Sequence, residues 1–264
     1  MQLAFASVLK GAVSFSEGNI NDTFRGEILK ADQSIVHAVL KDLPLKQLVN
    51  ELAASFLAHS QGLPTPKVYL ARVEPGIISV SKGPTLSDGS GIVFASEDVK
   101  VPNVAFSFRN STASQSDLLI ATLIKWRLLG GLYAFDTWIA NIDRHPGNLL
   151  FGGGDDVWLI DHGHSFTGPK WISTDLKPDA PYSHRLNEWL TPNMTSDQRL
   201  QKSKDSAKFV GALNKTECLN VAQECGAGTY LTSPEDADLS KFISQRIDFT
   251  IKITNDALGV PTVV

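Results

Sequence analysis

The chain has 264 residues, 42% of them hydrophobic, and it carries a formal net charge of −4 at pH 7. A chain of this size and composition can bury a substantial core, as one two-lobed domain or as two small ones. Its mild negative charge provides no overall basic field for nucleic acid or an anionic membrane, so we expect neither as a direct partner.

Targeting segments are not indicated. Residues 1–15 lack a basic n-region and are interrupted by Lys10, which argues against a signal peptide. The longest apolar stretch, residues 118–140, contains several charged side chains and would make a poor membrane span. The two cysteines, Cys218 and Cys225, match neither a zinc pattern nor a disulfide scaffold. We therefore expect a cytoplasmic protein.

The first forty residues are predicted to be rich in strands. The strand patterns lie at residues 12–15, 23–29 and 34–40. Between the first two is a polar segment with one glycine, whose backbone N–H groups and hydroxyls could bind nucleotide phosphates. Ser16 and Gly18 are the candidates for that contact. A plain hairpin is an equal alternative, because the segment is not a GxGxxG loop.

An amphipathic helix is predicted directly after the third strand. Apolar residues recur at helical spacing from Leu45 to Leu57, whereas Glu51 lies off that stripe. Lys41 ends the preceding strand, and such a lysine followed by a helical glutamate is typical of the pair with which kinases hold the α- and β-phosphates of ATP. Taken alone, Lys41 and Glu51 are more often solvated surface charges. Only the motif downstream favours the kinase interpretation.

Further strands complete an N-terminal lobe, which we place at residues 1–96. Gly62 and the prolines after it end the helix. The additional strands are predicted at residues 67–73, 77–80 and 91–95. The link to a second lobe, residues 97–264, falls near residues 95–98, where backbone groups would bind adenine.

Helical patterns dominate the second lobe. The predicted helices are residues 118–129, 132–140, 184–190, 196–210, 215–225 and 234–258. Ser116 and Asp117 are the expected caps of the first helix, and its even hydrophobicity predicts that it is buried. Gly130 and Gly131 are expected to separate it from the second. Residues 170–181 are predicted to form an irregular loop, either a connector or a segment that docks the substrate.

The residues able to do chemistry surround a predicted β-hairpin. Two short apolar strands, residues 149–151 and 157–160, flank a glycine turn. Such a hairpin brings Asp143 and Asn148, just before its first strand, close to Asp161, just after its second. The sequence therefore places two carboxylates and an amide in one small volume.

These three side chains suit Mg²⁺, which prefers oxygen ligands and keeps waters and substrate phosphates in its shell. Protein kinases use an aspartate that orients the acceptor hydroxyl, an asparagine five residues later, and a metal-binding aspartate after a hairpin. Asp143, Asn148 and Asp161 follow that order with the HRDxxxxN spacing. Either aspartate alone is more simply a turn cap, but the full constellation favours the metal site.

Residues 141–148, NIDRHPGN, and 159–166, LIDHGHSF, resemble the catalytic and metal-binding segments of HipA-like kinases. They are also similar to the DRHxxN and IDFG elements of the more distant phosphoinositide lipid kinases. The resemblance implies an α+β, two-lobed, protein-kinase-like fold. It also implies ATP as the phosphate donor, Mg²⁺ held by Asn148 and Asp161, and a serine or threonine of a protein substrate oriented by Asp143.

Several finer points depend on the resemblance alone. His145 is a candidate catalytic residue, although a loop-stabilising role is as well supported. His162 stands where many kinases have phenylalanine, which puts an activation switch based on that ring in doubt. The family also implies autophosphorylation at Ser14 or Ser16, a toxin or stress-response role, and an antitoxin-type partner.

Other functions remain open at this stage. A lipid kinase would be helped by a basic membrane-facing loop, but residues 170–181 carry two cations beside two acids. A pseudokinase that acts by binding nucleotide would not need Lys41, Glu51, Asp143 and the metal ligands together. Transfer of AMP or of an amino acid is not excluded by motifs for metal and nucleotide.

Overall fold

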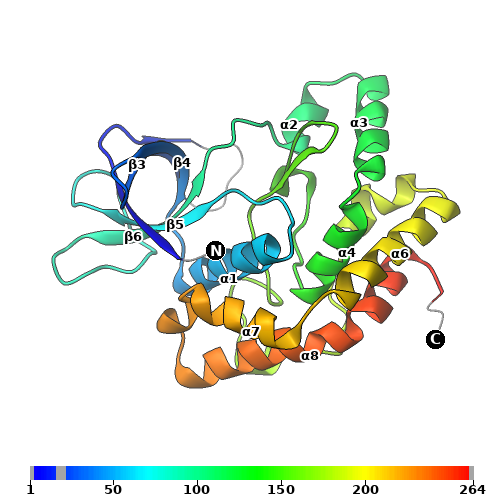
Figure 1. The fold of residues 1–264 in the computed structure, drawn as a ribbon. Coiled ribbons are helices and arrows are strands. Elements are labelled where there is room, and N and C mark those ends of the chain that lie inside the picture. Colours follow the sequence, from blue (N-terminus) through cyan, green and yellow to red (C-terminus); the bar gives the residue numbers. More distant parts are fainter. Residues whose placement is uncertain (1–2, 16–21, 262–264) are drawn as a thin grey trace.

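The computed structural model describes residues 3–15 and 22–261. Six strands in the N-terminal part form one sheet in the order β1-β5-β6-β4-β3-β2. They are β1 Ala4–Val8, β2 Val13–Ser14, β3 Thr23–Lys30, β4 Ile35–Lys41, β5 Val68–Val73 and β6 Gly91–Glu97. Strand β1 pairs parallel with β5 and antiparallel with β3, so the sheet closes on itself as a small barrel (Figure 1).

The barrel has a core of its own, separate from the main hydrophobic core. Small and branched side chains fill it, including Ala38, Ala71 and Ala95, which are at most 1% exposed. Larger residues such as Ile28 and Leu40 are fully buried beside them. Closure removes most of the free strand edges that an open sheet would leave. The sequence pattern predicted the β-rich lobe but did not identify β1 or the closure.

Helix α1, Leu45–Ser60, forms as predicted from its apolar periodicity. It begins after Pro44 and ends at Ser60, followed by Gln61 as its C-cap and by Gly62 with φ of +70°. The helix is buried along most of its length, because it lies between the barrel and the helices of the C-terminal part (Figure 1). It packs there against helix α7, Lys215–Glu224, and the short η4, Ala227–Tyr230.

The remaining elements build a mostly helical part. They are α2 Val104–Arg109, α3 Ala113–Lys125, α4 Leu129–Trp138, η1 Pro146–Asn148, β7 Leu149–Gly153, β8 Asp156–Leu159, η2 Ser173–Asp175, α5 Leu186–Trp189, η3 Thr191–Asn193, α6 Ser196–Gly211 and α8 Ser233–Leu258. Helix α4 lies at the centre and packs against α6 and α8. Strands β7 and β8 pair antiparallel, as predicted for the hairpin. The division of the chain at residues 96 and 97 stays a prediction.

The strand predicted at residues 77–80 is wrong, because the chain bends at residues 77 and 78 and has no regular structure at 79 and 80. The backbone N–H groups that follow it find a carboxylate in place of a neighbouring strand. Those of Ser81, Lys82 and Gly83 donate to Asp42 at 2.7 to 3.2 Å. Because one side chain satisfies these donors, the segment needs no ladder of strand pairing.

The predicted break at Gly130 and Gly131 is also wrong, because both residues lie inside α4. A Cβ atom at Gly130 would lie 2.5 Å from the Cβ of Asp205, in α6. Ser206 of the same helix donates its hydroxyl to the Gly130 carbonyl at 2.7 Å. The glycine therefore allows α4 and α6 to pack closely, and the chain breaks earlier, at residues 126–128.

Helix α3 differs from its prediction in its start and its burial. Its N-cap is Thr112, in a capping box with Gln115, rather than Ser116 or Asp117. Only Leu123 and Ile124 of this helix are buried, because α3 is bent by 77° from the central helix α4. Within the described residues no single helix is both long and apolar enough to cross a membrane. Helices α3 and α4 pass that test only as this bent pair.

Candidate active site

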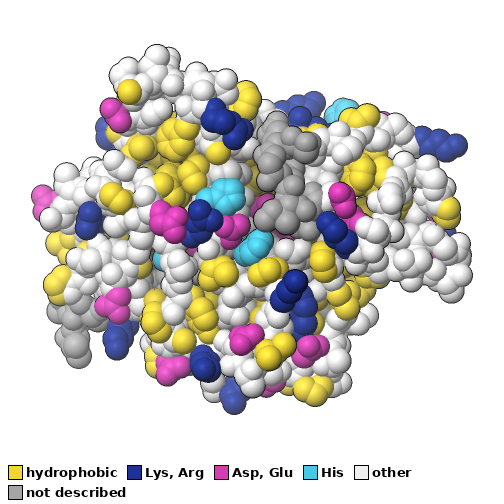
Figure 2. All heavy atoms as spheres, turned by 180° about the vertical axis from the view of Figure 1, so that it is seen from behind, with side chains coloured by type: hydrophobic (Ala, Val, Ile, Leu, Met, Phe, Trp, Pro, Cys, Tyr) yellow, Lys and Arg dark blue, Asp and Glu magenta, His cyan; other side chains and the backbone are white. Residues whose placement is uncertain are grey.

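A cleft of about 820 Å³ is lined by barrel strands, helix α1, the segment after β6 and the hairpin. The structure brings six of the eight predicted site residues to it. They are Lys41, Glu51, Asp143, His145, Asn148 and Asp161. The other two, Ser16 and Gly18, lie outside the described residues. Figure 2 shows acidic, basic and histidine side chains gathered near the middle of one face.

A lysine joins two carboxylates on one wall of the cleft. Lys41, the last residue of β4, places its Nζ 2.7 Å from Glu51 Oε1 and 3.1 Å from Asp161 Oδ1. Glu51 is 1% exposed, so its charge depends on this pairing. Burial opposes the charge on Lys41, but Asp161 and Glu51 outweigh it and raise the lysine pKa. Burial likewise opposes the charge on Asp161, but Lys41 lowers the pKa of that aspartate to about 2. Both therefore stay charged at neutral pH.

The backbone at Asp161 is held in an unusual conformation. Its φ is +57°, in the left-handed region that a residue with a side chain rarely occupies. The next N–H, of His162, donates to Glu51 Oε2 at 2.8 Å. Glu51 thus binds Lys41 with one oxygen and the loop after β8 with the other. This loop carries Asp161, so its position depends directly on helix α1.

Asn50, the neighbour of Glu51 on α1, strengthens that link. Its side-chain Nδ2 donates to the carbonyls of Gly163, Ser165 and Gly168 at 2.9 to 3.0 Å. Its Oδ1 accepts from the indole N–H of Trp171 at 2.9 Å. The residue is completely buried. One amide therefore satisfies several buried polar groups of the segment after Asp161.

Asp143 and Asn148 belong to the turn between α4 and β7. Asn148 ends η1 and donates its Nδ2 to the Asp143 carbonyl at 2.8 Å. The Asp143 N–H donates to Asn141 Oδ1 at 3.0 Å. His145 caps η1 by accepting the Gly147 N–H at its Nδ1, at 2.9 Å. These local bonds explain why so polar a turn has one defined shape.

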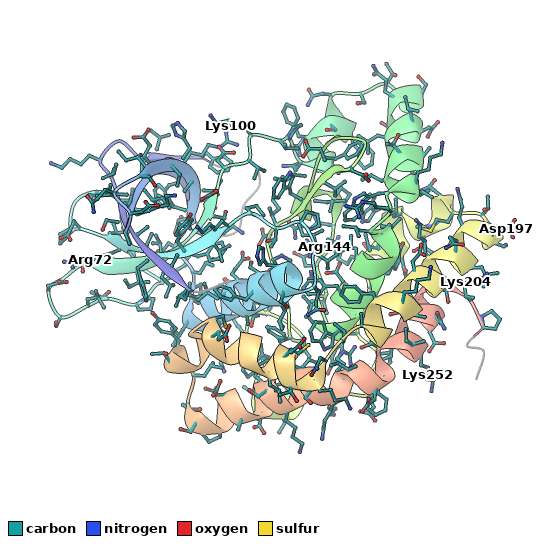
Figure 3. The ribbon with its side chains drawn as sticks, in the orientation of Figure 1. Arg72, Lys100, Arg144, Asp197, Lys204 and Lys252 are labelled. Atoms are coloured by element: carbon teal, nitrogen blue, oxygen red, sulfur yellow. The ribbon has the colours of Figure 1, made fainter. Side chains whose placement is uncertain are left out.

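Buried Arg144 connects this turn to the hairpin. It forms a two-pronged ion pair with Asp136 of α4, at 3.0 and 3.1 Å. It also donates to the carbonyls of Asn148 and Ile160, at 2.7 and 2.8 Å. Figure 3 marks Arg144 near the centre of the molecule. Through this side chain, the backbone on both sides of the site is tied to one helix.

His162 occupies the position after Asp161 and is 1% exposed. Its Nδ1 lies 3.2 Å from Arg144 Nη2. Burial, and then the charge of Arg144, lower the pKa of His162 well below its ordinary value. The ring is therefore neutral at pH 7, and the geometry suits an Nδ1 that accepts from the guanidinium.

The Asp143 carboxylate has a partner that the sequence analysis missed. Arg185, just before α5, donates its Nη1 to Asp143 Oδ1 at 2.7 Å. His164 Nδ1 and His145 Nε2 lie 3.6 and 3.8 Å from Asp143 Oδ2. No local pattern pointed to Arg185, which is 42 residues away along the chain. For Asn50 the only signal in the sequence was its position directly before Glu51.

The donor set at the mouth of the hairpin fits a magnesium ion. Asn148 and Asp161 both line the cleft, and the Ile160 N–H donates to the Asn148 carbonyl at 3.4 Å, which keeps the two neighbours close. An amide oxygen and a carboxylate are ligands that Mg²⁺ accepts beside phosphates and waters. Within the described ranges, no group of three or more His, Cys, Asp or Glu side chains could hold a metal.

Comparisons with known proteins identify a family and a fold. A family model described as HipA-like kinase matches residues 30–215. The crystal structure of a Helicobacter pylori proinflammatory kinase, CtkA, is similar to the chain with a TM-score of 0.57 and 12% sequence identity. The similarity covers 88% of this chain and 94% of that one, and it shows the kinase-like fold. A search of curated proteins finds no similar sequence.

Proposed function

The chain belongs to the HipA-like kinase family, a family of phosphotransferases, and from that premise we propose that it transfers the γ-phosphate of ATP to a serine or threonine hydroxyl of a protein. The single observation that carries the proposal is the ion-paired set Lys41, Glu51 and Asp161, which lines one cleft together with Asp143 and Asn148.

The proposed roles follow from the charges and their supports. Lys41, held by Glu51 at 2.7 Å, would bind the α- and β-phosphates. Asn148 and Asp161 would hold Mg²⁺, which when bound neutralises charge on the β- and γ-phosphates. Because these groups are already paired and oriented, they can stabilise the transferring phosphate with little rearrangement.

Asp143 would act on the acceptor side of the same cleft. It would accept the hydrogen bond of the substrate hydroxyl and orient its oxygen toward the γ-phosphorus. In the transfer, the bond from that oxygen to phosphorus forms and the bond to the bridging β–γ oxygen breaks, which leaves ADP. The hydroxyl proton passes to Asp143 and from there to solvent.

Two finer proposals concern regulation. Ser14, in β2, is exposed and is a candidate for autophosphorylation. Ser16, the other candidate serine, lies outside the described residues. A regulatory partner of the antitoxin type, as the family resemblance suggests, would be expected to alter access to this part of the protein or to the cleft.

The test is incubation of the purified protein with γ-labelled ATP and Mg²⁺, followed by intact mass and phosphosite mapping. Asp143→Ala and Asp161→Ala should transfer no label to the protein or to a cell lysate. Asp155→Ala is the matched control, because Asp155 lies on the hairpin turn and pairs only loosely with Arg127, at 3.7 Å. Nucleotide binding by the wild type without any transfer would instead support a binding protein.

A further inference from the structure

The two oxygens of the Asp143 carboxylate have different surroundings. Oδ1 accepts a charge-assisted hydrogen bond from Arg185 at 2.7 Å. Within residues 3–15 and 22–261, Oδ2 accepts no hydrogen bond, since the two nearby histidine nitrogens are 3.6 and 3.8 Å away. One oxygen is therefore occupied, and the other is available to a ligand.

Arg185 is delivered to this position by a rigid stretch of chain. The residue before it, His184, is buried, stacks on Tyr133 at 5.1 Å between ring centroids, and lies 3.1 Å from the Tyr133 carbonyl through its Nε2. The residue after it, Leu186, is completely buried. Because both neighbours are anchored, the arginine Cα is fixed and only the side chain can move.

Helix α5 also bonds to the turn between α4 and β7, which carries Asp143. Trp189 donates its indole N–H to the Arg144 carbonyl at 3.1 Å. Arg185 bonds a second carboxylate with its Nε, that of Glu188 at 3.2 Å. The guanidinium plane is thus set by a residue of its own helix while Nη1 reaches Asp143. This geometry uses the planar fork that lysine lacks.

We propose that Arg185 is a positioning residue for phosphoryl transfer: it holds Oδ1 of Asp143 and so presents Oδ2 to the acceptor hydroxyl. This inference rests on the proposed function. It assigns a role to a residue that does not line the cleft itself. Without Arg185 the carboxylate can rotate about its own bonds, and the acceptor is held in a wider range of orientations.

If Arg185 acted only by stabilising the fold, its loss would lower the melting temperature together with turnover. Arg185 is 37% exposed and its partners Asp143 and Glu188 are 22% and 58% exposed, and ion pairs that reach the solvent contribute little to stability. Loss of the arginine should therefore leave folding almost unchanged. A large effect on turnover at an unchanged melting temperature would be specific to positioning.

The experiment compares wild type, Arg185→Ala and Arg185→Lys at varied Mg-ATP concentrations. Two acceptors are compared. Transfer to dephosphorylated casein is measured as labelled casein, and transfer to water is measured as ADP formed. We expect Arg185→Ala to lower kcat about 10²-fold, as misplacement of a catalytic group does, with an unchanged KM for ATP. Arg185→Lys should recover part of the rate, because an ammonium can still donate to Oδ1.

Arg72→Ala is the matched control. Arg72 is 43% exposed and also bonds two carboxylates, those of Glu74 and Asp88, each at 2.9 Å. Figure 3 places it at the barrel edge, far from Arg144 and the site. This variant should keep the wild-type kcat.

Two results would overturn the inference alone: a wild-type kcat in Arg185→Ala, or a lowered kcat that Arg185→Lys does not raise and that comes with a lowered melting temperature. Absence of transfer by the wild type to both acceptors would overturn the proposed function and this inference together. The two failures are therefore distinguishable.

Discussion

Asp143 and Asp161, the two aspartates proposed to act in the cleft, are supported in different ways. Asp161 is paired with Lys41, which is itself paired with a glutamate that is 1% exposed, and the loop that follows is tied to helix α1 by buried Asn50. Asp143 is paired with Arg185, whose side chain is more than a third exposed. On the side proposed to bind phosphates, the paired charges thus reach the core through Glu51. On the side proposed to bind the acceptor, the Asp143 carboxylate is paired with a partly exposed arginine.

This difference has an energetic consequence. Removing one partner of a buried ion pair leaves an uncompensated charge and destabilises a protein strongly, whereas exposed pairs contribute little. Substitutions on the phosphate side should therefore lower stability and activity together. Those on the acceptor side should lower activity alone, and the following variants test that separation.

Lys41→Met should have the largest effect. It leaves Glu51 buried without its cation, so we expect a loss of about 3 kcal/mol in the free energy of unfolding. Phosphoryl transfer should fall about 10²- to 10³-fold or more, because a preorganised positive group is lost. Urea unfolding and single-turnover transfer measure the two effects.

Lys30→Met is the control for that variant. Lys30 is 19% exposed, close to the 14% of Lys41, but its partner Asp32 is 66% exposed. Its removal should change the free energy of unfolding by less than about 1 kcal/mol. Equal losses of unfolding free energy in the two variants would show that the buried pair contributes no more to stability than the exposed one.

Asp143→Asn should separate activity from stability. The amide keeps the shape of the side chain but accepts the hydroxyl proton poorly, so transfer should fall about 10²-fold or more. The free energy of unfolding should stay within about 0.5 kcal/mol of the wild type. A melting temperature lowered as far as in Lys41→Met would contradict the contrast between the two sides.

Asn50→Asp tests the tie between α1 and the loop after Asp161. The substitution keeps the volume but removes the donors to three buried carbonyls, which should cost about 2–3 kcal/mol of stability. Trp171→Phe removes the donor to Asn50 Oδ1, but it also shortens a buried ring that Lys46 contacts at 3.7 Å, so its loss of stability includes a packing cost. Chemical unfolding measures both variants, and a loss below about 1 kcal/mol in Asn50→Asp would refute the assigned importance of the carbonyls.

Glu235→Gln should have the smallest effect on the free energy of unfolding, and that effect should depend on pH. Glu235 bonds Lys46 of α1 at 2.5 Å, and that bond, together with those from the N–H and hydroxyl of Thr232, lowers the pKa of Glu235 from its ordinary 4.5 to about 2. The folded state therefore gains stability from the pair above pH 4.5 and loses it as the pH falls toward 2. The difference between wild type and variant should be below about 1 kcal/mol at pH 7 and vanish near pH 2.

A constant difference between wild type and Glu235→Gln from pH 7 to pH 2 would be inconsistent with this ion pair. Acid unfolding followed by circular dichroism at several denaturant concentrations measures it. The pair matters to the comparison because it joins α8 to α1, the helix that carries Glu51.

Much of the site was predictable because its spacing is local. The hairpin forces residues just before β7 and just after β8 together, so Asp143, Asn148 and Asp161 share one cleft as expected. Helix α1 followed from apolar periodicity, which also set Glu51 apart from the stripe. Predicted roles for these residues stay predictions, while the fold and the family are confirmed.

The secondary-structure predictions were wrong where contacts with residues distant in the sequence outweighed a local pattern. Gly130 and Gly131 have the signature of a break, yet the close approach of α6 made glycine the residue that allows α4 to continue. Residues 77–80 have strand-forming side chains, yet their neighbours bond to Asp42 rather than to a strand. In both places the partner lies far away along the chain.

Residue spacing alone was enough for the hairpin, the main helix and the order of the charged residues, because strand and helix periods are short and repeat along the chain. Closure of the barrel by β1, burial of Glu51 and the contacts of Asn50 and Arg185 were decided only in the folded molecule. Each joins residues from elements separated in the sequence, and such contacts leave no periodic trace. They form because buried polar groups must find partners wherever the packed elements place them.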